Sequence, residues 1–400
     1  MFGILFWIFV FLIFYTYAGY PLILELLARL KKQVPEYFPI QPSVSLMIAA
    51  FNEEHIIEAK INNALSLDYP REKLQIIVAN DNSTDQTAVI ANKYAGQGVL
   101  LVTTPDRMGK IGNINHAAQF ADGEILVISD ATNMYDRNAI QELVKPFSDP
   151  SVGISGGIHV IEQGDGVLGD SEGFYWKYET WIENNESILG TCITANGDIL
   201  AIRRELWKEI PIEVINDDLY LAITTIRDGK RVVITPKAIG RERVSPSARD
   251  EIIRRTRMAA GLFQAMSMSG QTMPWRYPQY VWQIISHKFM RPLLPFWMIG
   301  ALLANLGAIL WPSTPGKFDF FTLANPYQWI FAGLQFFAYL LAWVGNLSEK
   351  TKTTGFLFYL PTFLVNSNLA ALKGFMRYLN RQQTNQWQRV ERRNAITDSQ

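Results

Sequence analysis

Two aspartates, Asp81 and Asp130, each stand at the end of a short apolar run, where polar sequence resumes. Carboxylate oxygens suit Mg²⁺ and Mn²⁺, and Mg²⁺ often binds through one or two carboxylates together with substrate phosphates. The two side chains could therefore hold a nucleoside and a divalent cation that bridges a diphosphate. An isolated aspartate at a strand end is more often a cap or a turn former, so this chemistry requires that both lie at one edge of a sheet.

Basic residues that could neutralise phosphate charge occur in two places. Arg107 and Lys110 lie between the two aspartates, and Arg254, Arg255 and Arg257 follow much later. Arginine binds phosphate through a planar fork of donors, whereas lysine acts as a point charge. The later arginines also fit a basic patch that contacts anionic lipid beside a membrane segment, and the two roles are compatible.

Alternating strands and helices must position these side chains. Continuous apolar runs predict buried strands at 44–51, 74–81, 98–104 and 124–131. Amphipathic stretches predict helices between them, at 53–66, 83–96 and 113–120. This alternation is typical of an α/β fold, with a parallel sheet and helices on both faces. Ligands of such sheets bind beyond the carboxyl ends of the strands, which is where Asp81 and Asp130 fall.

Several other site classes are excluded or disfavoured. No GxGxxG follows the first strand, no GxxxxGK[ST] is present, and Gly164–Gly169 is interpreted as a loop. The single cysteine, Cys192, excludes a disulfide scaffold and a cysteine zinc site. The four histidines show no metal-ligand spacing. With 37 basic and 37 acidic residues, the chain lacks the basic excess of a nucleic-acid-binding protein, so no nucleic-acid partner is expected.

Apolar segments flank the α/β region. The first 27 residues hold one charge, Glu25, and two later runs at 289–311 and 327–343 are also long enough to span a bilayer. Arg29, Lys31 and Lys32 follow the first run, which places them in the cytoplasm and the N-terminus outside. Two later crossings then put the basic C-terminal tail inside as well. The shorter run at 356–372 is interrupted by polar residues and is interpreted as re-entrant or interfacial.

These observations predict four regions: an N-terminal transmembrane helix at 1–34, a cytoplasmic α/β domain at 35–284, transmembrane and interfacial helices at 285–376, and a basic cytoplasmic tail at 377–400. A multi-pass protein of the inner (plasma) membrane is the expected location.

The motifs of the middle region resemble those of family 2 inverting glycosyltransferases. AAFNEE, IIVANDNSTDQT, RMGKIGNINHA and ISDATNMYD are similar to the nucleotide-sugar-binding half of that family. TANGDILAIRREL, INDDLYLAI, GKRVVITPKA and IRRTRMAAG are similar to its acceptor half, in the same order. With the flanking apolar segments, the layout resembles the membrane-embedded branch that includes synthases of cellulose, hyaluronan and poly-N-acetylglucosamine.

The resemblance implies a GT-A fold with a mixed, mainly parallel sheet. It also implies which residues line the nucleoside pocket: Ala50, Asn52, Glu53 and Asp81. Lys110 would approach the diphosphate. Asp130 would be the first acid of the DxD motif and would face a Mg²⁺ or Mn²⁺ ion.

The same resemblance implies the catalytic groups. Asp218 falls where the family has its general base, although Asn216-Asp217-Asp218 also fits the N-terminus of a helix. Arg255 and Arg257 fall on the basic part of the QxxRW motif, near the leaving group.

The sequence departs from the family pattern at three places. Asn80 stands where many members have an aspartate, and Thr132 stands where the second acid of DxD is common. QxxRW reads Arg254 to Met258 without its glutamine and tryptophan. Since that tryptophan lies beside the acceptor sugar in processive members, its loss bears on polymerisation.

The expected activity is transfer of a sugar from a nucleotide sugar, with UDP as the first choice, to a growing polysaccharide or lipid-linked glycan. Export or synthase subunits are possible partners. Two alternatives stay open: a non-processive transferase that adds one sugar to a polyprenyl-linked acceptor, and a catalytically degenerate subunit of a glycan synthase.

Overall fold

The computed structural model describes residues 1–31, 35–161, 166–242, 248–314, 316–348 and 356–381. The chain divides into two compact units. Of the described residues, the sheet unit comprises those in Leu24–Asp250 and Ser267–Gln283, and the helical unit comprises those in Met1–Ile23, Glu251–Met266 and Ile284–Arg381. Glu251–Met266 lies inside the predicted 35–284 domain but groups with the helical unit.

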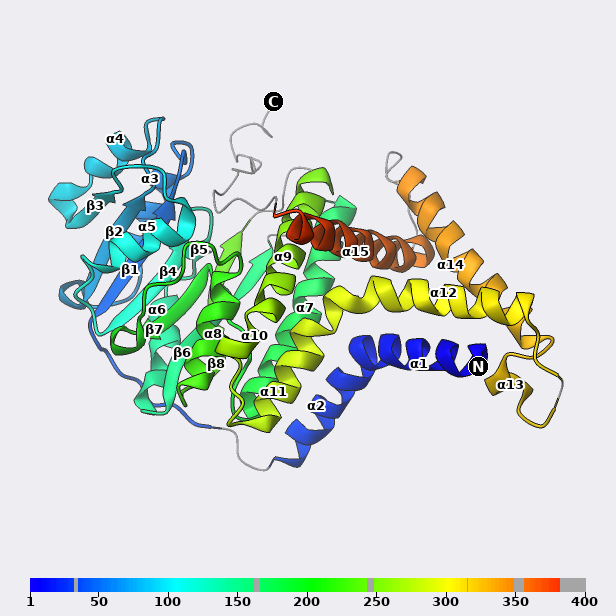
Figure 1. Cartoon of the computed structure of the whole chain (residues 1–400). Coiled ribbons are helices and arrows are strands. Elements are labelled where there is room, and N and C mark those ends of the chain that lie inside the picture. The colour runs from blue at the N-terminus through cyan, green and yellow to red at the C-terminus, as the bar shows by residue number, and fades with distance from the viewer. Residues whose placement is uncertain (32–34, 162–165, 243–247, 315, 349–355, 382–400) are drawn as a thin grey trace. The chain divides into compact units, whose positions relative to one another are not determined.

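Within the described residues, the sheet unit is built on one mixed sheet in the order β3-β2-β1-β4-β7-β6-β8-β5 (Figure 1). The strands are β1 (Val44–Ala50), β2 (Leu74–Asn80), β3 (Val99–Thr103), β4 (Ile125–Asp130), β5 (Met134–Tyr135), β6 (Val152–Ile161), β7 (Ile199–Arg203) and β8 (Arg231–Glu242). β1 to β4 pair in parallel, which confirms the four predicted strands.

Strand direction decides which residues share the ligand edge. β7 runs antiparallel between β4 and β6, and β8 runs parallel to β6. The start of β7 therefore lies beside the end of β4, where Ser129 pairs with Ile199. The ends of β6 and β8 lie at the same edge, where Ile161 pairs with Glu242.

Helices cover both faces of the parallel part of the sheet. Val44, Leu46 and Ile48 of β1 share one buried core with residues of α3 and α6, whereas α5 packs against β1 and β2 from a different set of side chains. The helices of this unit are α2 (Tyr20–Leu30, which begins in the helical unit), α3 (Ile57–Leu65), α4 (Thr87–Asn92), α5 (Gly109–Ala118), α6 (Ala139–Val144), α7 (Gly166–Leu189), α8 (Asp217–Arg227), α10 (Ser269–Thr272) and α11 (Pro278–Ile284).

Two sequence interpretations need correction. The helix predicted at 53–66 begins only at Ile57, because Asn52 has a positive φ of 54° and its neighbours bind the loop after β2. The loop predicted at Gly164–Gly169 is wrong from Gly166 onward, where α7 begins, and residues 164 and 165 lie outside the described residues.

The helical unit holds all or most of each remaining α-helix of the described residues. These are α1 (Phe2–Phe14), α9 (Ala248–Ser267), α12 (Leu294–Leu310), α13 (Asp319–Thr322), α14 (Tyr327–Ser348) and α15 (Phe356–Leu379). Gly300 and Gly307 of α12 leave room for the rings of Phe9 and Phe2, because an added Cβ would lie within 2.6 Å of either ring. Small residues at such contacts let apolar helices approach closely.

Among the described residues, three helical segments are long and apolar enough to cross a membrane: Phe2–Leu30, Pro278–Leu310 and Tyr327–Leu347. They cover the three runs predicted to span. The fourth run, predicted to be re-entrant or interfacial, lies in the continuous helix α15.

Candidate functional site

Asp81 and Asp130 both lie at the carboxyl edge of the parallel strands. Asp130 is the last residue of β4, and Asp81 follows β2 directly. Asp81 is buried, and its carboxylate accepts backbone hydrogen bonds from Met108 at 2.7 Å and Gly109 at 2.9 Å. These bonds fix the start of α5, because the first N–H groups of a helix have no partner within it. Asp81 therefore positions the helix that carries Lys110.

Lys110 joins the two halves of the site. Its Nζ lies 2.7 Å from Asp130 Oδ1 and donates to the carbonyl of Gly197 at 3.4 Å. Burial alone would lower the pKa of Lys110, but the negative charges of Asp130, Asp217 and Asp198 outweigh it and raise the pKa above its usual range. Lys110 is therefore a cation at neutral pH, surrounded by carboxylates.

Asp218 lies beside Gly197, whose carbonyl accepts the hydrogen bond from Lys110. It stands in the first turn of α8, and its Oδ1 accepts the backbone N–H of Leu219 at 2.7 Å. A Cβ added to Gly197 would lie 3.2 Å from Asp218 Cβ. Asp81 thus holds the start of α5, which carries Lys110. Lys110 in turn contacts Asp130 and the carbonyl of Gly197, and Gly197 lies beside Asp218.

The predicted nucleoside residues line the loops after β1 and β2. Ala50 ends β1 and pairs with Asn80 of β2. Asn52 Oδ1 accepts the backbone N–H of Thr84 at 2.8 Å, and the backbone N–H of Glu53 donates to Thr87 Oγ1 at 2.7 Å. The two loops are therefore held together beside Asp81, and the role of these residues in nucleoside binding stays a prediction.

Arg255 and Arg257 lie on α9, in the helical unit. Arg255 Nη1 donates to Ser367 Oγ of α15 at 3.0 Å, and its guanidinium lies 4.8 Å from the ring centre of Phe363. Their role near a leaving group stays a prediction from the sequence.

Three further residues stand at the same edge of the sheet: His159, Asp198 and Glu242. The imidazole of His159 lies between the two carboxylates, and one ligand atom from each residue falls within a group less than 4.8 Å across. Metal-ligand spacing within one segment does not reveal these residues, because His159 lies on β6, Asp198 immediately precedes β7 and Glu242 ends β8. The sequence does place these residues near strand ends. That these ends lie at one edge of the sheet follows only once β7 is known to run antiparallel to β4.

The charge balance around this group is tight. Burial opposes ionisation of Asp198, but His159 and Lys110 outweigh it and hold the pKa of this carboxyl well below its usual range. Beneath it, the fully buried Lys60 donates to the backbone carbonyl of Asn133 and lies 4.0 Å from the ring centre of Tyr135. Burial lowers the pKa of Lys60 to about 7, although Asp130 and Asp198 act in the opposite direction.

Known proteins share this sequence pattern. The family profile described as Glycosyl transferase family 2 matches residues 45–210. A beta-monoglucosyldiacylglycerol synthase from Nostoc sp. is 27% identical over 197 residues, which cover 45% of this chain and 40% of the relative. A poly-beta-1,6-N-acetyl-D-glucosamine synthase from Staphylococcus aureus is 24% identical over 202 residues, which cover 49% of this chain and 48% of the relative. The chain thus spans about half or less of these relatives' length.

The fold is similar to that of a solved mannosyltransferase. The structure of this enzyme from Pyrobaculum calidifontis, in complex with GDP-Man and Mn²⁺, has a TM-score of 0.70 to the present one. The match covers 96% of this chain and 100% of that chain, at 22% identity. At this identity the likeness concerns the fold alone. Residues 45–210 thus match the profile of glycosyl transferase family 2, and the chain has a GT-A fold like that of the solved mannosyltransferase.

Proposed function

We propose that the chain is a membrane-bound inverting transferase that moves a sugar from a nucleotide sugar to a polysaccharide or lipid-linked glycan. A UDP-sugar is the first candidate donor. The observation that carries the proposal is the position of Lys110, 2.7 Å from Asp130 and hydrogen-bonded to Gly197 beside Asp218. An inverting transfer needs a donor site and a base close together, and this contact supports both within one edge of the sheet.

Asp218 acts as the general base in this proposal. It accepts the proton of the acceptor hydroxyl as that oxygen attacks the anomeric carbon of the donor sugar. Gly197 supports the role, because a side chain there would press on Asp218. Glycine therefore leaves the carboxylate its space.

Asp130 would hold a divalent cation beside the diphosphate end of the donor. A strand-end carboxylate fits Mg²⁺ or Mn²⁺, since both prefer oxygen ligands. When bound, such an ion would stabilise negative charge on the departing nucleoside diphosphate. Lys110 is positively charged and lies beside Asp130, so in this proposal its ammonium group orients the diphosphate oxygens and balances their negative charge. Arg255 and Arg257 would add positive charge at the leaving group.

The three apolar helical segments support a multi-pass membrane protein. Basic residues stand at position 29, at the end of the first segment, and at positions 31 and 32, just after it; the positive-inside rule therefore favours a cytoplasmic sheet unit. In the cytoplasm, the proposed donor site at the carboxyl edge of the sheet has access to nucleotide sugars.

Transfer of a single sugar to a lipid-linked acceptor is the second candidate. Met258 occupies the position where processive members have tryptophan, and its side chain is exposed. A flexible thioether gives a sugar ring a poorer stacking surface than an indole does. Product length, measured with a radiolabelled donor, separates one addition from many.

Asp218→Asn tests the proposal. This change preserves shape but removes the base, so kcat should fall about 10²- to 10⁴-fold while the donor dissociation constant stays nearly unchanged. UDP-Glc, UDP-GlcNAc and GDP-Man are assayed in turn with membranes that contain the full chain. Asp228→Asn, at the opposite end of α8, is the matched control and should leave both constants unchanged. An equal loss of donor affinity in Asp218→Asn would assign this residue to donor binding instead.

A further inference from the structure

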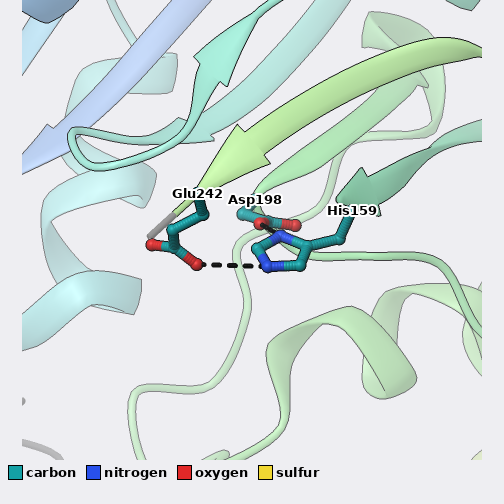
Figure 2. A group of neighbouring side chains, drawn as sticks. All are labelled: His159, Asp198 and Glu242. Carbon is teal, nitrogen blue, oxygen red and sulfur yellow. Dashed lines mark hydrogen bonds and ion pairs between the residues drawn. The ribbon is translucent and has the colours of Figure 1, made fainter. Parts of the chain in front are cut away.

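Strands β6 and β8 and the residue before β7 bring His159, Asp198 and Glu242 together (Figure 2). His159 lies on β6, Asp198 immediately precedes β7, and Glu242 ends β8. His159 pairs with Gly240 across the β6–β8 ladder, so Glu242 follows two residues later on the same face of β8. The sheet register therefore fixes this meeting, independently of any loop.

The imidazole of His159 faces one carboxylate with each nitrogen. Nδ1 lies 2.6 Å from Asp198 Oδ2, which is a short hydrogen bond. Nε2 lies 3.4 Å from Glu242 Oε2, which is longer than an ordinary N–H···O hydrogen bond. The Nδ1 side is thus tightly bonded, whereas the Nε2 side and Glu242 are spaced more widely.

Neighbouring side chains hold both carboxylates in place. The Thr132 hydroxyl donates to Glu242 Oε1, and Asn133 Nδ2 donates to Asp198 Oδ2 at 2.6 Å. The ring of Trp176 lies against the imidazole, with ring centres 4.9 Å apart. His159 is 5% exposed and Glu242 is 8% exposed. The group is therefore pre-organised and largely shielded from water.

We propose that His159 Nε2 and Glu242 Oε2 bind a divalent cation, with Asp198 orienting the imidazole through Nδ1. Two ligands at about 2.1 Å from one ion, separated by 3.4 Å, subtend an angle of about 110° at that ion. That angle is close to the tetrahedral value of about 109°. A histidine that bonds a carboxylate through its second nitrogen is the common arrangement at metal sites.

The mixed donor set indicates the kind of ion. Imidazole suits transition metals, whereas carboxylate suits Mn²⁺ and Mg²⁺ alike. One nitrogen and one carboxylate oxygen therefore favour Mn²⁺ over Mg²⁺, which keeps its water ligands and takes oxygen donors.

The site also accounts for a departure from the family pattern. Thr132 stands where a second acid of DxD is common, and its hydroxyl holds the carboxylate of Glu242. Glu242 thus brings to that turn the negative charge that the sequence lacks at position 132. This role in donor binding rests on the proposed function, whereas ion binding itself does not.

The test is Mn²⁺ binding to the full chain in detergent micelles, without nucleotide or acceptor, followed by electron paramagnetic resonance. We expect one bound Mn²⁺ per chain that shows ¹⁴N hyperfine coupling from the imidazole. Glu242→Gln and His159→Gln should each weaken binding at least tenfold, and Asp198→Asn should weaken it about 10- to 100-fold. The matched control is Glu205→Gln, which replaces an exposed carboxylate just after β7 by a carboxamide. This variant should bind Mn²⁺ as the unmodified chain does.

Two results would overturn the assignment. Bound Mn²⁺ without ¹⁴N coupling in the unmodified chain would exclude His159 as a ligand, and this measurement needs no variant that might misfold. Full retention of binding in Glu242→Gln and His159→Gln, with loss in Asp130→Asn, would move the ion to Asp130. Because neither donor nor acceptor is present, a failure here leaves the transfer reaction untouched, and inactivity of the enzyme leaves the ion site untouched.

Discussion

The pair between Lys110 and Asp130 should contribute a measurable coupling free energy to the stability of the sheet unit. The side chains are only 19% and 14% exposed and lie 2.7 Å apart. Lys110→Met leaves Asp130 beside the further negative charges of Asp198 and Asp217, which Lys110 now balances. Asp130→Asn leaves a buried ammonium without its nearest partner. Each single change should therefore destabilise the fold.

The magnitude follows from distance and burial. Two unit charges 2.7 Å apart attract by about 6 kcal/mol at an effective dielectric constant of about 20. Desolvation of both groups offsets part of this attraction, and removal of one partner from a buried pair costs about 3–5 kcal/mol. We therefore expect each single variant to lose about 3 kcal/mol and the double variant to lose much less than twice that, with a coupling of about 2–4 kcal/mol.

The assay is guanidinium unfolding of the full chain in detergent, with the free energy of unfolding extrapolated for the four members of a double-mutant cycle. Lys208 and Asp228 form the matched control pair, because they lie 2.6 Å apart but are 70% and 34% exposed. Their coupling should be below about 1 kcal/mol and should fall with salt. Additive effects of Lys110→Met and Asp130→Asn, within about 0.5 kcal/mol, would refute the reasoning.

Two further changes test the support beneath the site. Gly240→Ala should lower the melting temperature, because the added Cβ would lie 2.3 Å from Asn133 Oδ1 and would displace a side chain that holds Asp198; Gly96→Ala, which adds its Cβ to open space, is the control. Equal melting temperatures for the two variants would contradict this account. The stability of the unmodified chain in EDTA should rise between pH 7 and 10.5, because the unfolded chain there keeps a proton on Lys60 that the folded chain has released. Lys60→Met should flatten that rise in thermal unfolding measured across the same pH range, and an unchanged slope would assign the rise to other groups.

The parallel half of the fold is predictable because its strands are buried on both faces. Val44–Ala50 and Leu74–Asn80 are almost uniformly apolar, without the alternation of a half-exposed strand. Such continuous apolar runs are typical of parallel strands, and these strands are parallel. The helix after β1 is harder to place. Asn52 and Glu53 bind the loop after β2, and these bonds delay the helix by several residues beyond its apolar pattern.

The second half of the site depends on strand direction, which the residues do not reveal locally. Asp198 looks like part of a polar loop until β7 is known to run antiparallel beside β4. His159 and Glu242 are 83 residues apart in the chain, and only the pairing of β6 with β8 brings them together. Long-range pairing of this kind leaves no periodic trace in one sequence.

The place of β8 in the sheet also orders events on the ribosome. β6 is bordered by β7 and β8, and β8 begins about 70 residues after β6 ends. At about 5–20 residues per second, translation leaves one side of β6 bare for roughly 4–14 s. An open strand edge invites pairing with other chains during that interval. Slow codons between positions 161 and 231 would thus raise the risk of aggregation. Slow codons after position 242 would raise it less, because β8 is then available to pair with β6.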